Sequence, residues 1–187
     1  MKNVKAPDKP RTVRHLGEVD ITKLREMVSK LEEQVWEEEN EDKPNKFGAL
    51  NKTRHIVFRF IVNSNTNRFY YNRPVWEEWE EVLQPVLDQA TQAYNYSRGA
   101  YPRIMLAKLP AGTLIHKHID GSNAARLSHK IHVPLQTNEE CYFFVNEEPF
   151  RMLEGQAYEV NNLAMHWAEN RGKTDRIHLI FEYFSKD

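Results

Sequence analysis

Three short apolar runs separated by turn residues make up the stretch TLIHKHIDGSNAARLSHKIHVPLQTNEECYFFVNE, residues 113–147. The runs are short and contain β-branched or aromatic residues, and Gly121 and Asn138 stand between the runs. Such runs are typical of β-strands, and glycine and asparagine are typical of the turns between them. The stretch therefore predicts three consecutive strands of a β-rich fold.

The same pattern continues on both sides of this stretch. Before it, strands are predicted for HIVFRFIVN at residues 55–63 and for PRIMLAKL at residues 102–109. After it, the strand-like runs are PFRMLE (149–154), QAYEVNN (156–162), AMHWAE (164–169) and RIHLIFEYF (176–184). Many short strands at this spacing predict a β-sandwich or a jelly-roll barrel.

Two amphipathic helices are predicted ahead of most of the strands. Apolar residues recur every three or four positions from Asp20, a suitable N-cap, to Trp36, and again from Pro74 to Tyr94. Pro85 is expected to kink the second helix. The sequence thus predicts a mainly β fold with flanking helices, in which a jelly-roll barrel packs against N-terminal helices.

The chain length of 187 residues predicts a single domain, 1–187, because a domain has roughly 150 residues. Within it we expect a solvated basic tail or an early strand at 1–19. Helical support is expected at 20–97 and the jelly-roll core at 98–187.

Composition narrows the classes of partner and compartment. A net charge of −1 gives no general attraction for nucleic acid, and no apolar stretch approaches the roughly 18 residues that cross a membrane. Cys141 is the only cysteine, which excludes an internal disulfide, and the N-terminus lacks the apolar run of a secretory signal. We therefore expect a cytoplasmic protein, a monomer or homodimer, without nucleic-acid or membrane partners.

A candidate metal site lies in the strand-rich half of the chain. His118 is followed two positions later by Asp120, and residues two apart on a strand point to the same face about 6.6 Å apart. His166 lies on a predicted neighbouring strand and is a candidate third ligand. Two imidazoles and one carboxylate with open coordination positions are the facial triad of non-haem Fe(II) oxygenases. Zinc hydrolases also accept this donor set, so zinc stays an alternative.

Arg176, ten residues after His166, favours iron. A guanidinium at the start of a predicted strand can hold a carboxylate through two parallel hydrogen bonds. A suitable ligand is 2-oxoglutarate, which chelates iron through its keto-acid end and leaves its distal carboxylate to be held. The charges of Fe²⁺, Asp120, 2-oxoglutarate and Arg176 then cancel, as a buried site requires.

Four blocks of sequence, in this order, resemble the aspartyl/asparaginyl β-hydroxylase family of Fe(II)/2-oxoglutarate dioxygenases: HKHID (116–120), KIHVPLQTN (130–138), LEGQAYEVNNLAMHWAEN (153–170) and RIHLIFEY (176–183). The resemblance covers roughly residues 100–184. It implies a double-stranded β-helix, which is a cupin-like jelly roll, with the catalytic core at 98–187. It also implies that O₂ and 2-oxoglutarate are consumed, that succinate and CO₂ are released, and that an unactivated C–H bond is hydroxylated.

Position by position, the resemblance implies that His118 and His166 bind iron and that Arg176 clamps the distal carboxylate of 2-oxoglutarate. It implies that His132 lies beside the cosubstrate. This chain has Lys130 where the family usually has arginine, so that a two-point contact there becomes a single-point contact.

Asp120 is another point of comparison, because some members, including the animal aspartyl hydroxylases, lack a carboxylate ligand at that place. Its presence implies a full triad. It also suggests the branch of small bacterial hydroxylases that act on amino acids or peptides. A short chain without a repeat domain favours a small substrate, so we expect an amino acid, free or within a peptide.

The substrate side of the site is marked less clearly. Ser122, Asn123 and Arg126 follow the triad in a predicted loop, and Arg68 lies in the polar, aromatic segment 63–74, which is either a lid or a connector. We consider these four residues as candidate substrate contacts. Supporting roles at the rim, in the structure or at the surface are expected for His116, His129, His178 and Asn170.

Two other functions stay open from the residues alone. His116 and His118, with His166 and Asn170, are similar to a cupin metal motif, which would favour an isomerase or hydrolase that does not use 2-oxoglutarate. The glutamate expected three to four residues after the histidine pair is missing, since Gly121 and Ser122 stand there. The third function is a non-catalytic metal-binding module.

Overall fold

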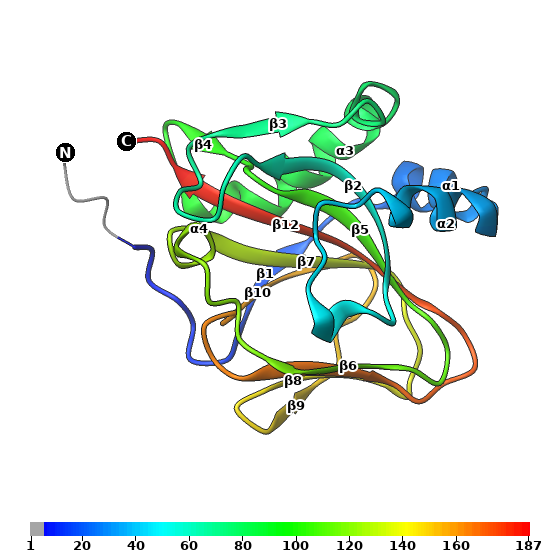
Figure 1. Ribbon diagram of the computed structural model, residues 1–187. Coiled ribbons are helices and arrows are strands. Elements are labelled where there is room, and N and C mark those ends of the chain that lie inside the picture. The colour runs from blue at the N-terminus through cyan, green and yellow to red at the C-terminus, as the bar shows by residue number, and fades with distance from the viewer. Residues whose placement is uncertain (1–5) are drawn as a thin grey trace.

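The chain folds as two antiparallel β-sheets that face each other, with helices over the outer face of the larger sheet (Figure 1). The structure is a computed structural model and describes residues 6–187, so that Lys2 and Lys5 of the expected basic tail lie outside the described residues. The arrangement is the mainly β fold with flanking helices that the sequence predicts. It is a jelly roll whose two sheets are separate in their strand pairing.

Eight strands form the larger sheet. They are β1 Val13–Glu18, β2 Arg54–Ile61, β3 Tyr70–Asn72, β4 Gly99–Ala100, β5 Ile104–Leu109, β7 His129–Gln136, β10 Gln156–Val160 and β12 Arg176–Ser185. Their order across the sheet is β1-β10-β7-β12-β5-β2-β3, and β4 pairs with β12. The sheet therefore places segments from both ends of the chain side by side.

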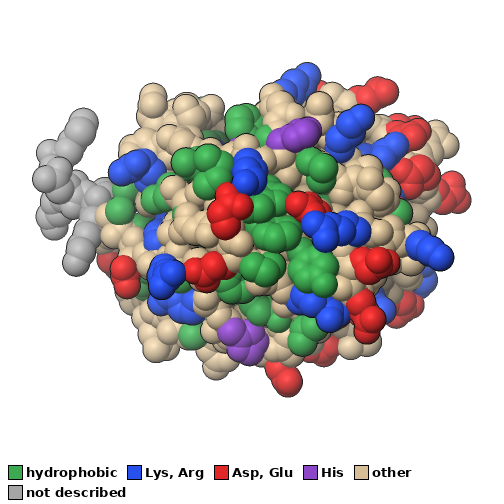
Figure 2. Space-filling view, turned by 90° about the horizontal axis from the view of Figure 1, so that it is seen from below, with side chains coloured by type: hydrophobic (Ala, Val, Ile, Leu, Met, Phe, Trp, Pro, Cys, Tyr) green, Lys and Arg blue, Asp and Glu red, His purple; other side chains and the backbone are tan. Residues whose placement is uncertain are grey.

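Four strands form the smaller sheet. They are β6 Leu114–His118, β8 Cys141–Val145, β9 Glu148–Phe150 and β11 His166–Asn170, in the order β6-β11-β8-β9. Figure 2 views the molecule from the side of this sheet, and hydrophobic side chains gather there among charged ones. On this sheet the rings of Phe144 and Trp167 stack with centroids 4.5 Å apart, and Lys117 Nζ lies 4.2 Å from the centroid of the Trp167 ring.

Alternation along β12 explains how polar side chains come to lie between the sheets. Ile177, Leu179 and Phe181 belong to the apolar core beneath the helices. Arg176 and Ile180 line a cavity on the other face. Because side chains of a strand alternate between its faces, one sequence supplies both the core and the lining of the interior. A second, smaller apolar cluster that includes Leu109, Ile115, Phe143 and Val145 fills part of the space between the sheets.

The predicted helix over 20–36 is two helices, α1 (Thr22–Ser29) and α2 (Glu33–Glu41). Glu32 between them is extended, with ψ of 155°, which ends the helical path. The break allows α1 to pack on α3 and β7 while α2 packs on β2, so that Leu24 and Trp36 are both buried. The acidic residues Glu37, Glu38, Glu39 and Glu41 form the second half of α2.

The second predicted helix is α3 (Trp76–Thr91), followed by the short 3₁₀ helix η2 (Gln92–Tyr94). It continues through Pro85 as one helix, and its first helical residue is Trp76. Trp76 and Trp79 are buried in the core. No helix within residues 6–187 is both long and apolar enough to cross a membrane.

The N-terminal segment is tied to the sheets and is not a solvated tail over the described residues. Strand β1 pairs with β10, from Val13 opposite Val160 to Glu18 opposite Gln156. Ahead of it, Lys9 Nζ donates to the carbonyl of Ser128 and to Asn162 Oδ1, the latter at 2.8 Å. Burial lowers the pKa of Lys9 to about 8.

Candidate active site

A cavity lies between the two sheets. One wall comes from β2, β5, β7 and β12 of the larger sheet, and the other from β6, β8 and β11 of the smaller sheet. All six residues that the sequence predicts for the metal and the cosubstrate line this one cavity: His118, Asp120, Lys130, His132, His166 and Arg176.

His118 and His166 lie opposite each other on the paired strands β6 and β11, with ring centroids 4.2 Å apart. His118 Nδ1 is 2.7 Å from the carbonyl oxygen of His116, and His166 Nδ1 is 2.9 Å from that of Ala164. A ring nitrogen that donates to a carbonyl carries the proton, so the Nε2 lone pair of each ring is free for a metal. Burial holds the pKa of His166 below its ordinary value, which favours the neutral, ligating form.

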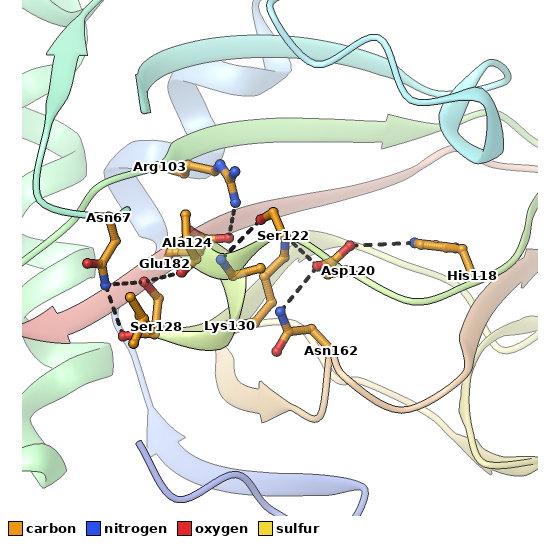
Figure 3. Close-up of polar contacts among 12 residues, drawn as sticks. Asn67, Arg103, His118, Asp120, Ser122, Ala124, Ser128, Lys130, Asn162 and Glu182 are labelled. Carbon is orange, nitrogen blue, oxygen red and sulfur yellow. Dashed lines mark hydrogen bonds and ion pairs between the residues drawn. The ribbon is translucent and has the colours of Figure 1, made fainter. Parts of the chain in front are cut away.

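Asp120 reaches the histidines from beyond the end of β6 and not from the strand itself. Its backbone N–H donates to the carbonyl of Asn162 at 2.9 Å. Asp120 Oδ1 lies 4.0 Å from His118 Nε2, and Oδ2 lies 3.3 Å from Lys130 Nζ (Figure 3). Burial alone would raise the pKa of Asp120, but Lys130 and the nearby histidines outweigh it and hold the pKa below its usual value. The carboxylate is therefore ionised at neutral pH.

These three side chains are the group of metal-ligating residues found in the described part of the chain. One donor atom from each lies within 4.8 Å of the others. Two neutral imidazoles and one carboxylate on one side of an ion leave positions open for further ligands, which is the donor set of non-haem Fe(II) oxygenases and is also acceptable to zinc. The residues present thus fit a ferrous ion.

Arg176 lines the same cavity and is 2% exposed. Its Nε and Nη2 atoms have no hydrogen-bond partner among the described residues. A buried cation without a counter-ion is strongly destabilising, and burial accordingly lowers the pKa of Arg176 from its ordinary value. Two unpaired nitrogens of one guanidinium match the two oxygens of a carboxylate, so the site fits the distal carboxylate of 2-oxoglutarate.

His132, on β7, is fully enclosed beside Arg176 and Lys130. Its Nδ1 lies 3.5 Å from Nδ1 of His178. Burial holds the pKa of both rings well below the ordinary value, and the positive charge of Arg176 adds to the shift, so both rings are neutral. The sequence predicts a structural or surface role for His178. In the structure His178 is buried next to the site, and its Nε2 atom is unpaired among the described residues.

A second cavity, of about 280 Å³, adjoins the first and is called here the outer cavity. Asp120 and Lys130 line both cavities, so the outer cavity begins at the triad. Its other walls include the short 3₁₀ helix η1 (Gly48–Leu50), with Arg103 and Ser122.

Of the four candidate substrate contacts, Ser122 lines the outer cavity, and the other three line neither cavity. Residues 123–126 are not a loop but a short helix, α4 (Asn123–Arg126), whose N-cap is Ser122. Asn123 Nδ2 donates to the carbonyl of Asn65 at 2.7 Å, whereas Arg126 and Arg68 are exposed. Part of the segment expected as a lid or connector is strand β3, paired with β2 at the sheet edge.

Of the four residues of the cupin-like motif, His118 and His166 are brought together, but His116 and Asn170 are not. His116 is exposed and lines neither cavity, and only its carbonyl contacts His118. Asn170 braces the turn after β11, donating to the carbonyls of Leu109 and Thr174 at 3.1 and 2.9 Å. The expected bracing role of Asn170 is confirmed, and so is the structural role of His129, whose Nδ1 lies 2.6 Å from Glu159 Oε1.

Asn162 is the residue of the site that sequence reasoning missed. It is fully buried, and its Nδ2 donates to Asp120 Oδ2 at 3.4 Å while its carbonyl accepts the N–H of Asp120. Lys9 supports it in turn, through the bond to Asn162 Oδ1. No spacing in the sequence marks these contacts, because they join segments more than 40 residues apart. An asparagine pair at a strand end is otherwise typical of a turn.

We predict that Asn162→Ala weakens metal binding about 10- to 100-fold, because side chains that orient a ligand contribute on that scale. The measurement is the affinity of the apoprotein for Co²⁺ in a chelator competition. Asn161→Ala is the matched control, since Asn161 bonds to Arg11 and Leu163 and not to Asp120. Equal affinities for the two variants would contradict the orienting role of Asn162.

Comparison with known proteins identifies related sequences and folds. A family model described as aspartyl/asparaginyl β-hydroxylase matches residues 75–185, which is more than half of the chain. A comparison with curated proteins found no match.

Several solved structures share the fold. A 2OG-Fe(II) oxygenase family oxidoreductase from Burkholderia pseudomallei has a TM-score of 0.61 at 11% identity, over 88% of this chain and 77% of that chain. The non-heme alpha-ketoglutarate-dependent carbocyclase SnoK from nogalamycin biosynthesis has a TM-score of 0.61 at 13% identity, over 94% and 80%. A Pseudomonas putida prolyl-4-hydroxylase has a TM-score of 0.52 at 8% identity, over 94% of each chain. These likenesses show the jelly-roll fold.

Proposed function

Because this chain belongs to the aspartyl/asparaginyl β-hydroxylase family, we propose that it hydroxylates an unactivated C–H bond of an amino acid, free or within a peptide. As a member of this family the chain is an Fe(II)/2-oxoglutarate-dependent dioxygenase, and its cofactor and cosubstrates are Fe(II), 2-oxoglutarate and O₂. The observation that carries the proposal is the single cavity that contains both the candidate triad and the unpaired Arg176.

In the proposed site His118, Asp120 and His166 hold the ferrous ion. The two histidines present Nε2 because their Nδ1 atoms are bonded to backbone carbonyls. The Asp120 carboxylate is kept ionised by Lys130, which contacts Oδ2 and leaves Oδ1 on the side of His118. When bound, the iron supplies the oxidation in which 2-oxoglutarate loses CO₂ to become succinate, with one oxygen atom of O₂ entering succinate and the other the C–H bond.

Arg176 is the proposed partner of the distal carboxylate of 2-oxoglutarate, since two of its nitrogens are unpaired and no solvent reaches it. His132 lies in the same cavity as a neutral ring that can donate one hydrogen bond. Lys130 is the proposed third contact and bonds Asp120 from the same position. With iron and 2-oxoglutarate bound, the formal charges of Fe²⁺, Asp120, 2-oxoglutarate and Arg176 sum to zero. The positive charge of Lys130 is then left without a counter-charge.

The outer cavity is the proposed place of the substrate, because it borders Asp120 and has a volume of about 280 Å³. That volume is near the lower end of ordinary small-molecule sites, roughly 300 Å³, and suits a small substrate such as an amino acid or the end of a peptide. Ser122 is the one candidate substrate contact that lines it.

The test is to incubate the purified full chain with Fe(II) and 2-oxoglutarate in air, alone and with a panel of amino acids and peptides. We expect slow succinate formation without substrate, and faster formation with a substrate that gains one oxygen atom, in equal amounts of succinate and product. Activity that is indifferent to 2-oxoglutarate in a zinc-loaded protein would support the isomerase or hydrolase instead. Absence of 2-oxoglutarate consumption under every condition would support a non-catalytic module.

A further inference from the structure

The outer cavity is lined by two positively charged side chains and one carboxylate. Figure 3 shows Arg103 and Lys130 on the side of the cavity next to Asp120 and Ser122. Arg103 Nη1 is bonded to Oε1 of Glu182, but Arg103 Nε has no partner among the described residues. The guanidinium also lies 5.1 Å from the ring centroid of Phe60, another wall residue. One carboxylate thus neutralises Arg103 while part of its hydrogen-bonding edge stays unused.

The excess charge is positive once the inner cavity is filled. In the proposed complex the charges of the iron, Asp120, 2-oxoglutarate and Arg176 cancel, and Glu182 cancels Arg103. Lys130 remains, at the boundary of both cavities. A buried net charge is unfavourable unless an opposite charge accompanies it, so a substrate with one negative charge is the favoured occupant.

Among the described residues that line the outer cavity, no carboxylate is available to pair with an ammonium group. Asp120 is its one acidic wall residue, and this carboxylate is assigned to the metal. Glu182 contacts Arg103 from behind and is 1% exposed, so it is not available to a ligand. An amino acid with a free α-ammonium group would bring a positive charge next to Arg103 and Lys130, where nothing compensates it.

The remaining walls are apolar. Phe47 and Ile119 are 47% and 44% exposed, although both line the cavity next to the triad. The Phe47 ring also meets the His118 ring edge-on, with centroids 5.4 Å apart. The apolar wall residues are Phe47, Leu50, Phe60, Met105, Ile119 and Ala125. A ligand with an apolar body would cover them and gain roughly 25 cal/mol for each Å² removed from water.

We propose that the outer cavity binds a carboxylic acid with an apolar body and no neighbouring ammonium, and that Arg103 is its specificity-determining residue. The chemistry is shared by an N-acylated amino acid, the C-terminal residue of a peptide and a simple carboxylic acid. Arg103 and Lys130 face the carboxylate, and the apolar wall faces the body. This inference rests on the proposed function, because it takes the triad and the inner cavity as the iron and 2-oxoglutarate sites.

The experiment compares matched ligands with the full chain. The panel contains the N-acetyl derivatives of alanine, leucine and phenylalanine, the same compounds as amides, the free amino acids and N-acetylated dipeptides that end in these residues. Binding is measured without oxygen in the presence of Co²⁺ and 2-oxoglutarate by calorimetry, and stimulation of succinate formation is measured with Fe(II) in air. We expect at least one N-acetyl acid or dipeptide to bind at least tenfold more tightly than its amide and its free amino acid. The dipeptide arm separates a peptide C-terminus from a free small molecule.

Variants test the role of Arg103. Arg103→Gln is expected to weaken binding of the preferred acid at least tenfold and to leave binding of its amide and of 2-oxoglutarate unchanged. Because Arg103→Gln leaves Glu182 buried without its partner, the double variant Arg103→Gln/Glu182→Gln provides a neutral pair of similar shape. Arg103→Lys keeps the charge but not the planar fork, and is expected to restore part of the affinity. Arg25→Gln is the matched control, since Arg25 pairs with Glu154 on the helical side at 2.9 Å.

The outcomes separate the two claims. If the wild type consumes 2-oxoglutarate but every acid binds no better than its amide, the proposed substrate class is wrong and the proposed function stands. The assignment of Arg103 is wrong if the folded double variant binds the preferred acid as the wild type does. If the wild type consumes no 2-oxoglutarate and does not bind it, the proposed function itself fails.

Discussion

Replacing His166 by alanine is expected to lower succinate formation at least a thousandfold, which corresponds to about 4 kcal/mol of lost transition-state stabilisation. The variant leaves His118 and Asp120 as the two remaining ligands. Their donor atoms lie on one side of the site, 4.0 Å apart, and no further metal-ligating group among the described residues replaces the missing imidazole. We expect Asp120→Ala to lose activity to a similar degree, because Lys130 then faces the metal without a carboxylate between them.

Loss of metal is the expected cause, and it is measured separately from activity. Binding of Co²⁺ to the apoprotein and the absorption of the Co²⁺ complex should both be strongly reduced in His166→Ala. The matched control is His116→Ala, which removes an exposed imidazole from the same strand as His118 and keeps the backbone carbonyl that orients His118. Full activity in His166→Ala, or equal losses in His166→Ala and His116→Ala, would overturn the triad.

Replacing Arg176 by methionine is expected to change two properties in opposite directions. The KM for 2-oxoglutarate should rise at least a hundredfold, about 2.7 kcal/mol, because two charge-assisted hydrogen bonds to the distal carboxylate are lost. The free energy of unfolding of the apoprotein should rise or stay unchanged, because a buried and unpaired guanidinium is replaced by an apolar side chain of similar length. A purely structural role for Arg176 would predict the reverse for stability.

Steady-state kinetics at varied 2-oxoglutarate concentration give the KM. Thermal unfolding with and without 2-oxoglutarate measures the stability of each variant and its binding of 2-oxoglutarate. The wild type with Co²⁺ should be stabilised by added 2-oxoglutarate, as any ligand specific for the native state stabilises it, and Arg176→Met should not. Arg176→Lys should recover part of the affinity, since a lysine keeps the charge but offers a single point of contact. Arg171→Gln is the control from the same turn region, with an exposed arginine that pairs with Glu169. An unchanged KM for 2-oxoglutarate in Arg176→Met would remove this arginine from the cosubstrate site.

Much of the fold follows from local patterns. Along β7 and β12, side chains that face the apolar core alternate with side chains that face the other way. This pattern involves neighbouring residues only, so the sequence shows it directly. Helix boundaries were predicted less well. The break between α1 and α2 separates two helices that pack on different elements, and a continuous apolar period does not show where one contact surface ends and another begins. The short β3 and α4 carry too few residues for a pattern.

The candidate site divides in a similar way. His118 and Asp120 were found from their spacing, and His166 and Arg176 from their order along the chain and the resemblance. Lys130 was predicted as a cosubstrate contact, and in the structure it contacts Asp120, which lies on a different segment.

By itself, the sequence determined the chemistry: a β-rich chain with a histidine and an aspartate two residues apart, a second histidine on a later strand, and an arginine that starts the last strand. These features are local, because strand alternation and the ligand preferences of a metal depend on residue type and spacing. Only the tertiary structure decided which groups are left without partners. Arg176 is unpaired, Asn162 holds Asp120, and Arg103 shares the outer cavity with apolar walls because distant segments meet there. Burial and charge balance are properties of that assembly, and no short stretch of the chain contains them.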